Sequence, residues 1–159
     1  MAEARTSGLI LLHGLPEAPT ADPFTRLAPL RDALATLVPA QNIFPYYWRD
    51  DLPAARLGPI APALRGTLGG LVAPLFHQRL QRYQDTRPDI DRWLLGGYSA
   101  GGWILYQWLV GWEADGLRVR PSAAQLARVA MVFTLGAPYQ NVHDFLLFNG
   151  EPRQARHWR

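Results

Sequence analysis

The sequence contains no cysteine and no lysine, and these two absences exclude several kinds of chemistry. Without cysteine, the protein has no disulfide, no thiol nucleophile and no cysteine-ligated metal. All 16 basic residues are arginines, so no amine is available for a P-loop, a Schiff-base enzyme or a Ser–Lys dyad. The four histidines also lack the HExxH spacing of a zinc site. We therefore expect neither a metal nor a cofactor.

Long apolar runs are also absent. No stretch reaches the roughly 18 uninterrupted apolar residues of a membrane span, and the run at 8–12 is shorter than the ~7–15 residues of a signal-peptide core. We expect a cytoplasmic protein without a membrane span. The net charge is only +3, and most arginines are interleaved with acidic residues, so nucleic acid is not an expected partner.

The 159 residues, 48% of them hydrophobic, favour one domain covering 1–159. Short apolar runs alternate with helical patterns along the chain. Strands are expected at 8–13, 42–48, 92–97 and 129–135, and helices at 22–38, 63–84 and 99–114, with a further helix start at 144–148. This alternation indicates βαβ units and an α/β fold with a mainly parallel sheet of about four strands. Pro45 predicts that the second strand lies at a sheet edge or strand end.

The segment 97–102 (GYSAGG) matches the pattern G-x-S-x-G between an expected strand and an expected helix. In such a turn, Gly97 and Gly101 let strand and helix approach closely, and Ser99 lies at the positive end of the helix. One alternative is a glycine-rich turn that contains a serine by chance. Another is a dinucleotide-binding loop, but Ser99 replaces its second glycine, and the next strand ends in Gly-Ala-Pro rather than an acid.

Two further features follow expected strands. His13-Gly14 follows the first strand, and Thr134–Pro138 (TLGAP) follows the fourth. Together with the G-x-S-x-G segment, and in this order, they resemble the α/β-hydrolase superfamily, especially its lipase and esterase branches. The resemblance implies a three-layer α/β/α sandwich, here a hydrolase core that lacks the last strands.

The resemblance also implies roles for individual residues. Ser99 is expected to be the nucleophile that attacks a carboxylic ester or related acyl bond of a small-molecule substrate. The backbone amides of Leu15 and Ala100 are expected to form the oxyanion hole. His13 and Gly14 belong to the motif, and because the family's histidine there is structural, His13 is not assigned as the base.

The resemblance covers roughly residues 8–140 and breaks where the family places its acid and histidine. Asp144 is a candidate acid and His157 a candidate base, whereas His143 is too close to Asp144 to serve as its partner. His77 is expected on a helix surface. The chain is therefore interpreted as a C-terminally truncated hydrolase. The alternatives are a compact enzyme with an unusual dyad, or a non-catalytic hydrolase-like module that binds a small acyl ligand or a protein partner.

The aromatic residues and the exposed sheet edge also lead to expectations about packing and assembly. The tryptophans of the helix at 99–114 either pack that helix or line an acyl pocket, and packing is the favoured reading. The tyrosines and tryptophan at 46–48 are expected near the site, where they either form a pocket wall or play no part in it. A four-stranded sheet leaves an exposed edge, so a homodimer through that edge is expected.

Overall fold

The computed structural model describes residues 6–14, 22–52 and 67–136. Their core is a four-stranded sheet in the order β2-β1-β3-β6, and each neighbouring pair is parallel. The strands are β1 (Ser7–Leu12), β2 (Ile43–Tyr46), β3 (Arg92–Tyr98) and β6 (Val129–Leu135). The α/β class and the mainly parallel sheet are therefore confirmed.

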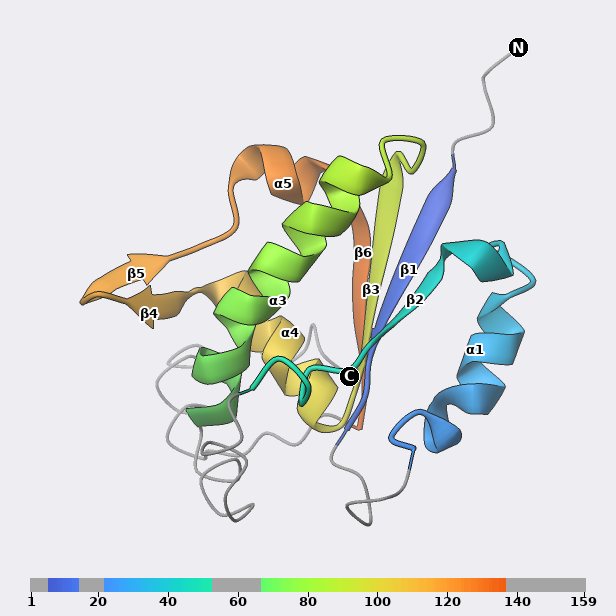
Figure 1. Cartoon of the computed structure of the whole chain (residues 1–159), viewed down its shortest axis with the longest axis horizontal. Coiled ribbons are helices and arrows are strands. Elements are labelled where there is room, and N and C mark those ends of the chain that lie inside the picture. The colour runs from blue at the N-terminus through green and yellow to red at the C-terminus, as the bar shows by residue number, and fades with distance from the viewer. Residues whose placement is uncertain (1–5, 15–21, 53–66, 137–159) are drawn as a thin grey trace, which may run out of the picture.

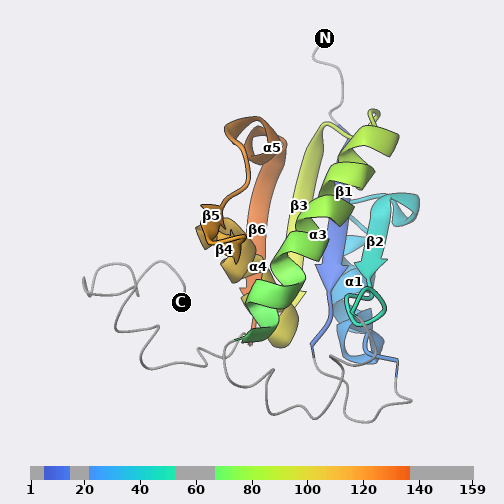
Figure 2. The same cartoon turned by 60° about the vertical axis from the view of Figure 1, so that its left-hand side comes forward.

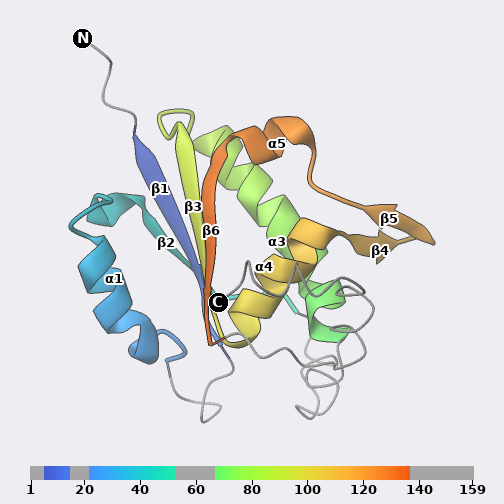
Figure 3. The same cartoon turned by 180° about the vertical axis from the view of Figure 1, so that it is seen from behind.

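The helices lie on both sides of this sheet. They are α1 (Ala28–Leu34), α3 (Thr67–Thr86), α4 (Ala100–Val110) and α5 (Ala123–Ala127), with short 3₁₀ turns at Thr25–Leu27 and Ala40–Asn42. Figure 1 shows α1 on one side of the sheet and α3 and α4 on the other, and the view from behind in Figure 3 agrees. None of the described helices has the length and apolar composition of a membrane span.

Strand β1 lies between β2 and β3 and is buried on both faces. Ile10 and Leu12 pack in the larger core cluster with the residues of α3 and α4. Leu9 and Leu11 face the opposite way and join the smaller cluster with residues of the α1 region. A strand in this position needs apolar side chains on both faces, which explains the continuous apolar run that predicted it.

Strands β2 and β6 form the two edges of the described sheet. Pro45 lies in β2 and is exposed, as expected for a residue that cannot donate a ladder hydrogen bond. At the other edge, β6 exposes Met131 by 49% and Leu135 by 42%. The homodimer through a sheet edge stays a prediction.

The prediction of one helix over 22–38 is wrong at both ends, because the α-helix covers only Ala28–Leu34 and a 3₁₀ turn at Thr25–Leu27 precedes it. The Asp22 side chain accepts a hydrogen bond from the Phe24 backbone N–H at 3.0 Å, but this contact lies before the first helical residue, because the 3₁₀ turn begins at Thr25 with Phe24 as its N-cap. α1 ends at Leu34, and Leu37, inside the predicted helix, is 76% exposed. Beyond Leu34, the chain continues through short-range turn hydrogen bonds that rotate Leu37 out and Val38 in.

The predicted helix over 99–114 is also too long. Helix α4 ends at Val110, and Gly111 follows with φ of 101°. Strands β4 (Trp112–Ala114) and β5 (Leu117–Val119) then form an antiparallel hairpin. Asp115 and Gly116 at its turn have φ of 51° and 75°, the combination of a type I′ turn, for which Asp-Gly is a strong sequence signal.

The carboxyl end of α3 is tied to the start of β6 by one arginine. The guanidinium of Arg128 donates to the carbonyl oxygens of Gln84 at 3.0 Å and Ile90 at 2.9 Å. These bonds satisfy carbonyl groups at the end of the helix and before β3, and Arg128 is partly buried. Beside it, Ser122 caps α5, because Ser122 Oγ accepts a hydrogen bond from the Gln125 N–H at 3.1 Å.

We expect Arg128→Ala to lower the free energy of unfolding by about 1.5–3 kcal/mol, because charge-assisted hydrogen bonds to partly buried carbonyls are lost. Urea unfolding monitored by circular dichroism measures this change. Arg82→Ala is the control, because Arg82 is an exposed residue of α3, and we expect its effect to stay within about 0.5 kcal/mol. Equal effects of the two variants would contradict a role for Arg128 in joining α3 to β6.

Candidate active site

The candidate site lies at a switch point of the sheet, where the connections that follow two neighbouring strands leave toward opposite faces. Strands β1 and β3 are neighbours and run parallel, but the chain leaves β1 toward α1 on one side of the sheet and leaves β3 into α4 on the other. The strands point the same way, so both connections start at one edge (Figure 2). In open α/β sheets, ligands bind at such a switch point, outside the carboxyl ends of the strands.

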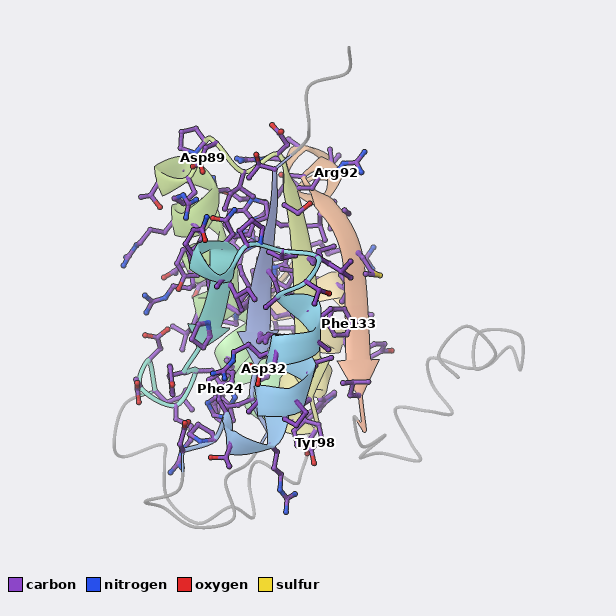
Figure 4. All side chains as sticks on the ribbon, turned by 90° about the vertical axis from the view of Figure 1, so that its right-hand side faces the viewer. Phe24, Asp32, Asp89, Arg92, Tyr98 and Phe133 are labelled. Carbon is purple, nitrogen blue, oxygen red and sulfur yellow. The ribbon has the colours of Figure 1, made fainter. Side chains whose placement is uncertain are left out.

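Figure 4 shows the two ends of the sheet by labelled side chains. Tyr98 and Phe24 lie at the carboxyl edge, and Arg92 and Asp89 lie at the opposite edge. Asp89 pairs there with Arg87 at 2.7 Å, and this hydrogen-bonded contact holds the pKa of Asp89 below its usual value. The ion pair is therefore remote from the candidate site.

Ser99 has a strained backbone. Its φ is 52° and its ψ is −118°, a conformation that residues with a side chain rarely adopt and that costs about 1–3 kcal/mol. Outliers of this kind cluster at active sites, where the surrounding structure enforces them. The strain sits at the one residue that the G-x-S-x-G pattern marks as the nucleophile.

The glycines around Ser99 are required by close contacts. A Cβ added at Gly97 would lie 2.5 Å from the backbone nitrogen of Gly102, and one added at Gly101 would lie 2.4 Å from the carbonyl oxygen of Leu12. Both distances are shorter than real Cβ atoms tolerate. The expected close approach of strand and helix is therefore confirmed, and the helix also approaches the end of β1.

Hydrogen bonds hold the Ser99 backbone from two sides. The Ser99 N–H donates to the carbonyl oxygen of Leu135 at 2.9 Å, and the Ser99 carbonyl accepts from the Gly102 N–H at 3.0 Å. The end of β6 therefore supports the Ser99 turn. Because Leu135 belongs to the TLGAP segment, the start of that segment lies beside the turn. Ala137 and Pro138 of that segment lie outside the described residues.

The two loops of the predicted oxyanion hole meet at Gly14. A Cβ on Gly14 would lie 2.8 Å from the Ser99 Cβ, so the His13-Gly14 segment abuts the serine. Ala100 is buried in the first turn of α4, and among the described residues its N–H has no acceptor, as is usual in a first turn. Leu15, the other predicted donor, lies outside the described residues.

His13 is fully buried in a cluster of aromatic rings. Its ring stacks on Trp48, with centroids 4.9 Å apart and planes at 18°, and meets the edge of Phe24 at 5.3 Å. The His13 Nδ1 donates to the carbonyl oxygen of Gly14 at 2.5 Å. Burial lowers the pKa of His13, so the ring is neutral near pH 7, and its packing agrees with a structural role rather than that of a base.

The remaining histidines were expected in different roles: His77 on a helix surface and His157 as the base, with His143 excluded as the partner of Asp144. His77 was expected on a helix surface, and this is only partly right: it is half-buried, its Nδ1 accepts from the Trp108 indole N–H at 3.4 Å, and its ring lies 5.0 Å from that of Trp112. The amphipathic pattern of α3 is interrupted by glycines and a proline, which hid this contact. The candidate acid and base, Asp144 and His157, lie outside the described residues together with His143.

The aromatic residues near the site divide by burial. Trp103, Trp108 and Trp112 belong to the larger core cluster, as the packing alternative predicted. Of the residues at 46–48, Tyr46 and Trp48 are buried, whereas Tyr47 is 40% exposed. The Trp48 indole N–H donates to the His13 carbonyl oxygen at 2.9 Å. No local sequence signal marks this contact, because the partners are 35 residues apart.

Histidine, aspartate and glutamate side chains of the described residues form no group of three that could hold a metal ion. Comparison with known protein families, with curated proteins and with solved structures finds no match to this chain.

We expect Gly101→Ala to lower the free energy of unfolding by about 1–3 kcal/mol, because the new methyl group meets backbone carbonyls that cannot move away. Gly70→Ala is the matched control within helix α3, because a Cβ there has no atom within 4 Å. That variant should gain about 0.5–1 kcal/mol from helix propensity. Chemical unfolding of both variants tests the pair, and a neutral Gly101→Ala would contradict the close contact of α4 with β1.

We expect the protein to lose stability as the pH falls below about 6.5, the pKa of an unperturbed histidine. The pKa of His13 is lowered in the folded state, so the unfolded chain binds more protons in this range, and protonation favours unfolding. Burial also lowers the pKa of His77, which adds a change of the same sign.

Urea unfolding between pH 8 and pH 5 measures this dependence. His13→Phe keeps an aromatic ring but removes the titrating group, so its stability should fall less with acid than that of the native protein. His77→Gln removes the other lowered histidine pKa and separates its contribution from that of His13. An unchanged pH dependence in His13→Phe would show that the acid sensitivity arises elsewhere.

Proposed function

We propose that this protein is a cytoplasmic serine hydrolase that acts on a carboxylic ester or related acyl bond of a small molecule. The proposal places the chain in a three-layer α/β-hydrolase core, with Ser99 as nucleophile. The observation that carries it is the strained Ser99 backbone at the switch point between β1 and β3. Strain at a turn costs stability, and a catalytic serine that must stand above the sheet explains why it is kept.

In the proposed reaction, the Ser99 hydroxyl attacks the substrate carbonyl and forms a tetrahedral intermediate. The Ala100 N–H, in the first turn of α4, and the Leu15 N–H donate to the oxyanion. Two such donors act where charge develops, and removing one typically lowers kcat by about 10²–10³-fold. The helix end adds favourable potential for the same negative charge. The intermediate then collapses: the bond to the leaving group breaks, the alcohol departs with a proton from the base, and an acyl ester remains on Ser99. Water hydrolyses that ester, which releases the acid and restores the serine.

The serine also needs a base to accept its proton. We propose His157 for this role and Asp144 as its acid partner, on their order in the chain after Ser99. His13 is a poor candidate because its ring is enclosed by aromatic neighbours and its Nδ1 is bonded to Gly14.

A second candidate function is a non-catalytic module that binds a small acyl ligand or a protein partner. One observation favours it: among the described residues, no hydrogen bond joins the Ser99 hydroxyl to a base. The described histidines are both engaged elsewhere, His13 with Gly14 and His77 with Trp108. The strained turn supports the hydrolase, because a binding module has no need of an exposed nucleophile.

We expect a fluorophosphonate probe to label the native protein once, on Ser99, and intact mass spectrometry detects the adduct. Activated serines react with this probe, whereas ordinary hydroxyl groups do not, because their pKa is too high. Ser99→Ala should not be labelled. Ser122→Ala is the matched control, because Ser122 caps α5 and its loss should leave labelling intact.

Circular dichroism must show that each sample is folded. Absence of labelling in the folded native protein would overturn the hydrolase proposal and favour the binding module. Labelling that persists in Ser99→Ala would place the reactive group elsewhere. If Ser99 is labelled, His157→Ala and Asp144→Ala should each slow the reaction.

A further inference from the structure

Trp48 makes a single polar contact with the loop that follows β1. It lies two residues beyond the end of β2, is 2% exposed, and donates its indole N–H to the His13 carbonyl oxygen at 2.9 Å. Its ring also stacks on the His13 imidazole, with centroids 4.9 Å apart. Trp48 therefore contacts both the main chain and the side chain of His13.

The same carbonyl oxygen faces α4 on its other side. A Cβ on Gly101 would lie 2.7 Å from the His13 oxygen, so this atom is close both to the helix start and to the indole N–H that it accepts from. Gly14, the next residue, abuts Ser99. Loops that follow three neighbouring strands thus meet here: the β2 loop through Trp48, the β1 loop through His13, and the β3 turn through Ser99.

The indole N–H selects one orientation of the His13–Gly14 peptide. An indole nitrogen is only a donor and a carbonyl oxygen is only an acceptor. If this peptide rotated, both groups would lose their partner inside the protein, and a buried unpaired polar group is costly. A tryptophan at 48 therefore fixes the main chain at the start of the loop, and phenylalanine in its place would pack but not fix it.

We propose that Trp48 is a positioning residue that holds the His13–Gly14 segment against Ser99. The inference rests on the proposed hydrolase function, in which this loop leads to one of the oxyanion donors. Trp48 touches the loop and acts through it. Its expected effect is therefore on the transition state, where the oxyanion forms, rather than on substrate binding.

The test compares Trp48→Phe with Trp93→Phe. Trp93 is also fully buried, but its indole nitrogen has no partner among the described residues, and it pairs with Gly8 at the other end of β1. Hydrolysis of p-nitrophenyl butyrate and the rate of fluorophosphonate labelling are measured for both. In Trp48→Phe, we expect kcat and the labelling rate to fall about 10–100-fold, with KM within about twofold, as for a displaced catalytic group. Trp93→Phe should match the native protein.

Equal rates in the two variants would overturn the proposal, as would an effect of Trp48→Phe on KM alone. Trp48→Leu is a second variant for the case in which Trp48→Phe does not fold, and the same loss is expected because leucine has no hydrogen-bond donor in its side chain. A native protein that is folded but unlabelled would instead overturn the hydrolase function. The hydrogen-exchange rate of the Gly14 amide then decides the positioning role: faster exchange in Trp48→Phe alone supports it, and unchanged exchange overturns it.

Discussion

The approach of the first turn of α4 to the end of β1 is the contact on which the site depends. Gly101 has no side chain, so the carbonyl oxygens of Leu12 and His13 lie where a Cβ would be. This contact sets the distance between the loops after β1 and β3. Beside it, the Leu135 carbonyl and the Gly102 N–H hold the strained Ser99 backbone through hydrogen bonds. The strain is local, and the packing that maintains it belongs to the whole sheet.

The aromatic cluster around His13 supports this contact from the opposite direction. Desolvation keeps the imidazole neutral, so the ring packs as an aromatic group between Phe24 and Trp48. A charged histidine in the same place would need a counter-ion. In the proposed hydrolase, His13 therefore has a structural role in the loop after β1, and a different residue accepts the proton from Ser99.

The sequence predicted the elements best where a single pattern decided them. The limits of β6 at 129–135 agree with the structure, and Pro45 lies on an edge strand as its chemistry requires. The prediction was wrong where one apolar pattern continued through a residue that ends the helix, as at Gly111. The tryptophans before and after Gly111 suggested one helix, but the Asp115-Gly116 turn makes the second part a hairpin. Trp112 is 4% exposed in the hairpin, and hydrophobicity alone does not distinguish a buried strand residue from a buried helix residue.

The sequence by itself determined the alternation of strands and helices and the position of a serine in a turn that only small neighbours permit. These are local properties, set by periodicity and by the absence of a Cβ at Gly97 and Gly101. The tertiary structure alone decided that Gly14 abuts Ser99 and that Trp48 binds the His13 carbonyl. Both contacts depend on the strand order β2-β1-β3, which brings distant segments to one edge and is set by the packing of the whole chain rather than by any one segment.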